Sequence, residues 1–387
     1  MRVPQLNKTS SSRRGRGGDL LAVLLLLLIL GGMGWLWWHQ KHPPKKSRRK
    51  PVAAAVAPAP VMASPPIVKP PPPVKIEVPP PRVLVTNPPT VPVVTPEKSA
   101  AGARPVRDVL EAQIALARLL ISSGSIDGAI GSQTRAAIAA FQRSQNLPVT
   151  GRLDTNTRPL LTLDTPILTT YAVTTNDLVR LQPLGKTWLE KSQQSALDYE
   201  TLLELVAEKS HAHPLLIKKL NPEVDWATVL AGTVLKVPDV NYPEPDGKAA
   251  RVIIHLAEKF LEAFDADTNL LAHFPCSIAA KVEKRPVGEL HVVVIAPNPN
   301  YTVNPELFPE SEELQAIGHK IILPPGPNNP VGVAWIGLDK PGYGMHGTPA
   351  PEQVGRTESH GCFRLANWDA EYLVKLVWIG MPVEVVP

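Results

Sequence analysis

The residues that could carry chemistry in this 387-residue chain are concentrated in residues 342–365, GYGMHGTPAPEQVGRTESHGCFRL. A thiolate is a strong nucleophile, but it needs a base within hydrogen-bond reach and a third group that holds the base in one tautomer. Cys362 can supply the thiol, and Gly361 beside it leaves room for a substrate carbonyl. The backbone N–H groups of His360, Gly361 and Cys362 are candidate oxyanion donors. The segment therefore predicts nucleophilic catalysis by a cysteine.

Two histidines compete for the role of base. His360 is two residues before Cys362, so in an extended segment the two side chains run parallel, with roots roughly 6–7 Å apart. His346 comes from another segment and can be aimed at the thiol. Gly347 after it leaves room for a backbone carbonyl to accept the second ring N–H. We predict His346 as the base and His360 as a supporting residue.

Other readings of these residues are a buried structural cysteine beside unrelated histidines, and a metal site. The chain has no His-Glu-x-x-His, and Cys362 with His360 gives too few ligands, so we expect no metal and no cofactor. The second cysteine, Cys276, is expected to be a buried strand residue. A Cys276–Cys362 disulfide is the alternative in an oxidising compartment, but it would block the nucleophile.

The segment resembles the L,D-transpeptidase family of the YkuD type. The shared pattern is Tyr-Gly-x-His-Gly-Thr, then twelve residues between His346 and Ser359, then Ser-His-Gly-Cys-x-Arg. Upstream, 329–332 (Asn-Pro-Val-Gly) and 285–289 (Arg-Pro-Val-Gly-Glu) resemble two further blocks of the family, with Arg285 where the family has Thr. The resemblance covers about residues 249–387.

The resemblance implies that Cys362 attacks a peptidoglycan stem peptide, with His346 as base, to form 3→3 cross-links through an acyl-enzyme. The residues that it implies for oxyanion or substrate binding are Tyr343, Gly347, Ser359, His360, Gly361 and Arg364. Arg364 can bind a stem carboxylate or brace the loop, and the sequence favours neither. Hydrolysis of the same acyl-enzyme and a non-catalytic wall-tethering role are the alternatives.

Short apolar runs separated by turns rich in Pro, Gly and Asn predict a mostly-β sandwich or barrel for the catalytic domain, residues 249–387. Its expected strands are 252–254, 291–295, 335–338 and 383–386.

Two smaller modules are expected before this domain. Residues 107–162 predict an all-α three-helix domain, with caps at Asp108 and Asp154, and resemble the peptidoglycan-binding domain of wall enzymes. Residues 165–240 predict strand–helix–helix–strand and resemble a divergent α+β LysM module, with about 30 extra residues after the first strand. Whether this module binds sugar or only spaces the domains stays open.

The N-terminal part predicts a membrane anchor and a spacer. Leu20–Trp38 is an uncharged run that would form a helix about 28 Å long, close to the hydrocarbon thickness of a bilayer. A cleaved signal peptide is the alternative. Residues 39–106 are Pro-rich and predict a disordered linker. We expect residues 1–19 in the cytoplasm, a single pass through the inner membrane, and the catalytic domain in the periplasm.

Charge and composition limit the partners. The net charge is +5, but the excess of Lys and Arg belongs to residues 1–50, which contain only one acid, Asp19. This distribution does not indicate a nucleic-acid-binding domain. We expect peptidoglycan as the partner, no nucleic acid, and a monomer.

Overall fold

The structure, a computed structural model, describes residues 102–357 and 361–387. The expected membrane helix Leu20–Trp38 and Ser359 and His360 lie outside the described residues. In the described part of the chain, no helix is long and apolar enough to cross a membrane. All described residues belong to one compact unit, Thr90–Pro387.

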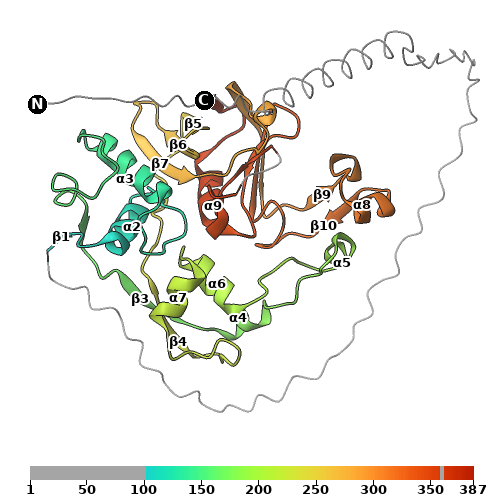
Figure 1. Ribbon diagram of the computed structural model, residues 1–387, viewed down its shortest axis with the longest axis horizontal. Coiled ribbons are helices and arrows are strands. Elements are labelled where there is room, and N and C mark those ends of the chain that lie inside the picture. Colours follow the sequence, from blue (N-terminus) through green and yellow to red (C-terminus); the bar gives the residue numbers. More distant parts are fainter. Residues whose placement is uncertain (1–101, 358–360) are drawn as a thin grey trace, which may run out of the picture. The chain divides into compact units, whose positions relative to one another are not determined.

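The first described module has two helices, α2 (Val109–Arg118) and α3 (Ser132–Ser144) (Figure 1). The Asp108 side chain accepts from the Glu111 N–H and caps α2, as the capping pattern predicts. The apolar faces of the two helices pack together, and a short antiparallel pair of β1 (Arg104–Pro105) and β2 (Thr162–Leu163) joins the ends of the module.

The third helix predicted for this module is absent from the described residues, so the prediction of three helices is wrong. Residues 154–161 form turns instead, with the Asp154 carboxylate accepting from the Thr157 N–H at 2.9 Å. The cap is therefore where the sequence indicates. A helix does not follow, because Pro159 has no N–H to donate to it and strand β2 already begins at Thr162.

The middle module pairs strand β3 (Leu168–Ala172) antiparallel with β4 (Val234–Pro238). Between them lie helices α6 (Leu202–Lys209) and α7 (Pro214–Leu220), in the predicted order strand–helix–helix–strand. The extra residues after β3 contain two short helices, α4 (Thr175–Val179) and α5 (Trp188–Ser192).

The C-terminal domain is built on one eight-stranded mixed sheet with the strand order β13-β12-β11-β8-β14-β5-β6-β7. These strands are β5 (Arg251–His255), β6 (Phe260–Phe264), β7 (Leu270–Pro275), β8 (Gly288–Pro297), β11 (Ala334–Leu338), β12 (Gly344–His346), β13 (Phe363–Arg364) and β14 (Pro382–Val386). The other elements are β9 (Tyr301–Val303), β10 (Ile321–Leu323), α8 (Glu312–Ile317), α9 (Asn367–Leu376) and the 3-10 helices Val282–Lys284, Pro305–Leu307 and Pro351–Gln353.

The sheet is a half-barrel, not a sandwich of two facing sheets. Its edge strands are β13 and β7, and the chain just after β7 returns to β13 through an antiparallel bridge between Ser277 and Arg364. The four predicted strands correspond to β5, β8, β11 and β14, with bounds that differ by a few residues. The prediction of a mostly-β domain is confirmed.

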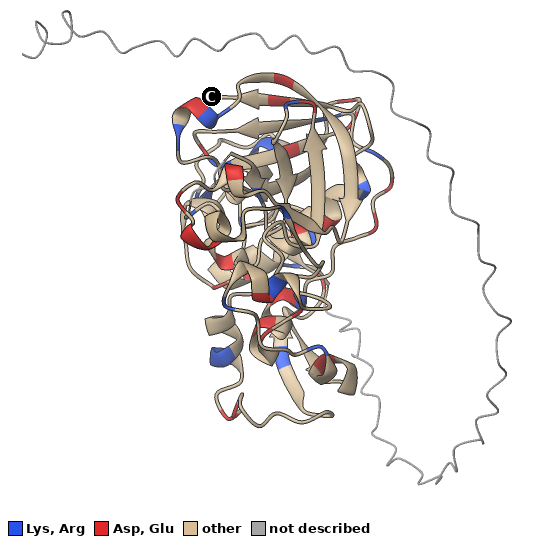
Figure 2. Ribbon diagram, turned by 90° about the vertical axis from the view of Figure 1, so that its right-hand side faces the viewer, with Lys and Arg blue, Asp and Glu red and all other residues tan. Residues whose placement is uncertain are grey.

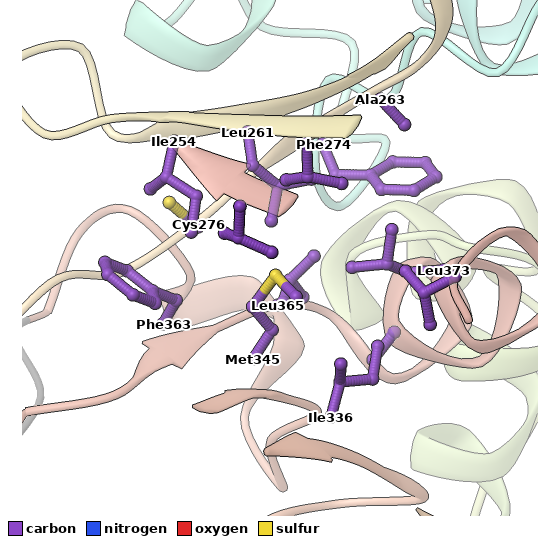
Figure 3. Packing of buried hydrophobic residues seen from close by; sticks show 14 of the residues in the cluster. Ile254, Leu261, Ala263, Phe274, Cys276, Ile336, Met345, Phe363, Leu365 and Leu373 are labelled. Atoms are coloured by element: carbon purple, nitrogen blue, oxygen red, sulfur yellow. The ribbon is translucent and has the colours of Figure 1, made fainter. Parts of the chain in front are cut away.

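The core of this domain lies between the sheet and helix α9 (Figure 3). Its fully buried members include Ile254, Phe274, Met345, Phe363 and Leu373. Met345 on β12 is paired with Phe363 on β13. Because side chains alternate along a strand, their neighbours on these strands point to the opposite face of the sheet.

The first module contacts the catalytic domain along edge strand β7. The Ser122 N–H donates to the His273 carbonyl at 2.8 Å, and the His273 N–H donates to the Leu120 carbonyl at 2.9 Å. Arg143 on α3 forms an ion pair with the buried Glu262 on β6. Acidic and basic residues are interspersed over the described ribbon (Figure 2).

Candidate active site

The strand pair β12–β13 brings the two sequence-predicted reactive residues to one edge of the sheet. The strands are parallel, and His346 pairs with Arg364. Cys362 precedes β13 and is two residues before Arg364, so it falls at the level of Gly344. Since Met345 and Phe363 point into the core, His346, Cys362 and Arg364 share the opposite face.

The tautomer of His346 is set by the backbone. Its Nδ1 lies 2.6 Å from the carbonyl oxygen of Gly347, which can only accept. Nδ1 therefore carries the proton, and Nε2 carries the lone pair that a base needs. The ring is buried, and this burial lowers the pKa of His346 to about 4, helped by the positive charge of Arg364. His346 is thus neutral and able to accept a proton at neutral pH.

Burial of the Cys362 side chain favours the protonated thiol. Burial raises the pKa of Cys362 to about 11, against a smaller opposite effect of the Gly344 backbone. Its Sγ donates to the carbonyl oxygen of Gly342 at 3.3 Å. The resting pair is therefore a thiol and a neutral imidazole rather than a thiolate and an imidazolium, and the proton must move during attack.

Gly361 and Tyr343 lie side by side next to the thiol. A Cβ on Gly361 would meet only the Tyr343 ring, at 4.0 Å, among the described residues. Lys340 Nζ lies 5.1 Å from the centre of the same ring. Apart from the Tyr343 ring, no described residue beyond the chain neighbours of Gly361 comes within 4 Å of this Cβ position.

Arg364 connects the strand pair to the loop that precedes Cys362. Its guanidinium Nη2 donates to Thr357 Oγ1 at 3.1 Å, and its backbone forms two hydrogen bonds with Ser277, of 2.8 and 3.0 Å. Ser277 Oγ in turn accepts from the Gly355 N–H at 2.9 Å. These contacts hold residues 355–357 close to β13.

Two parts of the chain match known families. Residues 249–385 match the YkuD family, described as the L,D-transpeptidase catalytic domain, and residues 106–161 match a family described as a peptidoglycan binding domain. Residues 249–385 form a YkuD-type L,D-transpeptidase domain. The matched ranges leave the middle module uncovered.

Relatives of this L,D-transpeptidase domain carry the same name. The chain is 26% identical over 188 residues to the L,D-transpeptidase named YkuD of Bacillus licheniformis, which covers 49% of this chain and 94% of that protein. It is 30% identical over 167 residues to the L,D-transpeptidase named YbiS of Escherichia coli, covering 42% of this chain and 53% of that protein. The chain thus spans about half the length of the second relative.

Among solved structures, L,D-transpeptidase 3 of Mycobacterium tuberculosis is 18% identical, covers 41% of this chain and 77% of its own chain, and has a TM-score of 0.29. A likeness of this size adds nothing to the family matches. Those matches support peptidoglycan L,D-transpeptidase activity by an enzyme with a cysteine nucleophile.

Sequence reasoning missed two side chains that hold His346 in the L,D-transpeptidase domain. Trp335 on β11 is paired with His346 and stacks on its ring, with centroids 5.6 Å apart. Asn367 at the start of α9 accepts from the Thr348 N–H at 2.9 Å, beside the turn that carries the Gly347 carbonyl. The sequence shows Trp335 only as a strand residue, and only its register with β12 reveals the contact.

Cys276 is a core residue, as the sequence predicts. It is fully buried directly after β7, and burial raises its pKa to about 12. Both Cys276 and Cys362 are outside any disulfide. Figure 3 shows Cys276 among the apolar side chains of the core.

Proposed function

We propose that the protein is a peptidoglycan L,D-transpeptidase in which Cys362 is the nucleophile and His346 the general base. The observation that carries this proposal is the hydrogen bond of His346 Nδ1 to the Gly347 carbonyl, at 2.6 Å. It leaves Nε2 free of a proton on the sheet face that Cys362 shares. A neutral imidazole there can take the thiol proton when the substrate is in place.

The first half-reaction forms a thioester. Nε2 of His346 removes the proton from Cys362 as Sγ attacks the carbonyl that links the third residue of a stem tetrapeptide, a diamino acid, to the terminal D-Ala. The tetrahedral oxyanion is stabilised by the backbone N–H groups of Gly361 and Cys362. We assign the N–H groups of Ser359 and His360 to the same role. Imidazolium then gives its proton to the departing amine of D-Ala, and an acyl-enzyme remains.

The second half-reaction releases the product. The side-chain amine of another stem's third residue attacks the thioester, and His346 takes a proton from it. The C–S bond breaks, the thiol is restored, and a 3→3 cross-link forms. Water in place of the amine would give trimmed stems instead.

We assign Arg364 to bracing the site. Its guanidinium donates to Thr357 at 3.1 Å, and its charge disfavours protonation of His346. Tyr343, whose ring lies 4.0 Å from the Cβ position of Gly361, is assigned to the substrate side of the site, and Gly347 is assigned to holding the base through its carbonyl oxygen.

The deciding experiment is incubation of the protein with purified muropeptides, followed by mass spectrometry. Cross-linked dimers support the transpeptidase, trimmed monomers support a hydrolase, and unchanged muropeptides support a wall-tethering protein. Cys362→Ser should fold and form no acyl-enzyme, and His346→Ala should slow acylation by about 10²-fold or more. Cys276→Ser serves as the matched control and should retain most of the activity.

We further propose that Leu20–Trp38 anchors the protein in the inner membrane as a single span, with the monomeric catalytic part in the periplasm. The residues between the span and the first module would act as a spacer. The predicted linker bound of 106 is wrong, because Arg104–Pro105 form β1 and Val106 is buried in the first module. The hydropathy of the run and the location of peptidoglycan support this arrangement. The peptidoglycan-binding module would add a second attachment and raise the local concentration of stems. Deleting residues 51–100 should leave activity on muropeptides unchanged and lower cross-linking in cells, and mature protein lacking residues 1–38 would contradict the anchor.

A further inference from the structure

We infer that Glu208, on helix α6 of the middle module, is a positioning residue for His346 and acts through Asn367. Glu208 lies outside the L,D-transpeptidase domain, residues 249–385. The inference rests on the proposed role of His346 as the base. It gives the middle module a part in catalysis that does not depend on sugar binding.

The hydrogen bonds that connect His346 to Asn367 begin at the turn after β12. His346 Nδ1 is held by the Gly347 carbonyl, so the position of the ring depends on the position of this peptide group. The next N–H, of Thr348, donates to Asn367 Oδ1 at 2.9 Å, and the Val333 N–H donates to the same oxygen at 3.3 Å. One amide oxygen therefore joins the turn after His346 to the segment before β11.

The backbone packs closely around this oxygen. A Cβ on Gly347 would lie 2.2 Å from Asn367 Oδ1, and a Cβ on Gly332 would lie 2.0 Å from it. Gly332 also has φ +61, a conformation that favours glycine. Both glycines thus allow the backbone to approach the amide of Asn367, which is only 1% exposed.

Glu208 is one of the groups that fix which way this amide points. Asn367 Nδ2 donates to Glu208 Oε1 at 3.1 Å and to Oε2 at 3.0 Å, with a third contact to the Pro327 carbonyl at 3.2 Å. Because these partners accept, the nitrogen faces them, and the oxygen faces the N–H groups of Thr348 and Val333. Two of the three hydrogen bonds that Nδ2 donates go to Glu208.

The carboxyl group is itself fixed within the middle module. Tyr199 OH donates to Glu208 Oε1 at 3.0 Å, and Tyr199 is buried. Burial and the nearby Glu204 raise the pKa of Glu208 to about 8, while Asn367, Tyr199 and Arg180 act in the opposite direction. Glutamine keeps one accepting oxygen and nearly the same shape at this position, so it is the conservative replacement for Glu208.

The test measures D-Ala release from a stem tetrapeptide by the full chain and its variants. Glu208→Ala should lower kcat by about 10-fold with KM nearly unchanged, because a misplaced base slows chemistry more than binding. Glu208→Gln retains an accepting oxygen and should recover most of the loss. Asn367→Ala should lower kcat at least as much as Glu208→Ala, and the double variant should be no slower than Asn367→Ala alone, since both act on one route.

Glu223→Ala, a change of the same type at an exposed position of the same module, should behave as the wild type. Unchanged kcat in Glu208→Ala, failure of rescue by Glu208→Gln, or additive losses in the double variant would overturn the inference. Thermal unfolding of each variant identifies any that fail to fold.

A readout without turnover separates this inference from the proposed function. The nitrogen-bound Nδ1 proton of His346 should give an NMR signal typical of a hydrogen bond to a carbonyl. Glu208→Ala should shift or broaden this signal, and Glu208→Gln should restore it. An inactive wild type would sink the proposed function alone, whereas a His346 signal identical in wild type and Glu208→Ala would sink the positioning role.

Discussion

Trp335 lies directly across from His346 in the β11–β12 pair, and its indole stacks on the imidazole with 27° between the ring planes. The stack needs the glycine at 344, because a Cβ there would lie 2.8 Å from the indole. The indole covers a face of the ring that water would otherwise reach. Burial of this kind is the main cause of the low pKa of His346, about 4.

Replacing Trp335 by alanine should therefore raise the pKa of His346 toward its ordinary value of 6.5. Protonated His346 cannot accept a proton, so activity on the stem peptide should be lost at low pH. In the wild type this loss is centred near pH 4, and in Trp335→Ala it should move up by about one pH unit or more. The measurement is the pH profile of kcat/KM for D-Ala release.

Trp335→Phe keeps an aromatic ring over the imidazole and serves as the control. Its acidic limb should stay close to that of the wild type. A limb that does not move in Trp335→Ala would show that the indole does not keep water from His346.

Alkylation of Cys362 tests whether the resting thiol is protonated. A thiol whose pKa is about 11 is ionised to about one part in ten thousand at pH 7. Iodoacetamide should therefore react slowly with the free enzyme at pH 7, and the rate should rise tenfold per pH unit up to at least pH 9. His346→Ala should change this rate little.

The site of alkylation is read by peptide mass spectrometry, with Cys362→Ser as the control for reaction at the core cysteine. A fast reaction at pH 7 that disappears in His346→Ala would instead indicate a thiolate–imidazolium pair in the resting enzyme.

The two glycines of the site should differ in their tolerance of a methyl group. In Gly347→Ala the new Cβ would lie 2.2 Å from Asn367 Oδ1, so the turn must shift. The expected cost is about 2 kcal/mol or more in the free energy of unfolding, together with loss of activity. Among the described residues, a Cβ on Gly361 would meet only the Tyr343 ring, at 4.0 Å, so Gly361→Ala should retain its stability.

Activity then distinguishes the two positions further. If substrate enters beside Gly361, Gly361→Ala should raise KM or lower kcat while denaturant unfolding stays that of the wild type. Equal stability losses in both variants would contradict the packing described here.

Asp369 on α9 should make stability depend on pH. It is fully buried, accepts from Tyr242 OH at 2.7 Å and from Ser122 Oγ at 3.0 Å, and has a pKa raised to about 7 by burial. The folded protein therefore holds a proton that the unfolded chain releases near pH 3.8. The stability that this proton confers is complete below about pH 3.8 and is lost as the pH rises through 7.

Asp369→Asn keeps the neutral shape of the side chain and removes the titration. Thermal unfolding between pH 4 and 8 should show the wild type losing stability relative to Asp369→Asn as the pH rises, with most of the loss below pH 7. Glu208 titrates in the same direction in both proteins, so the difference isolates Asp369. A constant difference across this range would show that Asp369 is already ionised in the fold.

The sequence predicts most of the secondary structure because local patterns determine it. The alternating burial of Val252 and Ile254 on β5 is visible in the sequence, and so is the cap at Asp108. The third helix after Asp154 was the wrong prediction, since a good cap says where a helix can start but not how far it continues. The reactive pair Cys362 and His346 is predicted from spacing alone, and its roles stay a proposal.

The residues that hold the pair could not be predicted in the same way. Trp335 meets His346 only through strand register, and Glu208 meets Asn367 although 159 positions separate them in the sequence. The first contact depends on strand register within one domain and the second on how two modules pack, and no short sequence pattern records either.

The hydrogen bonds between Leu120–Ser122 and His273 have a practical consequence for the domain boundaries. Strand β7 is an edge of the eight-stranded sheet, and its His273 backbone is covered by the first module. An uncovered edge offers unpaired N–H and C=O groups to the edge of another molecule. A fragment trimmed to the L,D-transpeptidase domain would expose this edge and should aggregate more readily than a fragment that begins before β1.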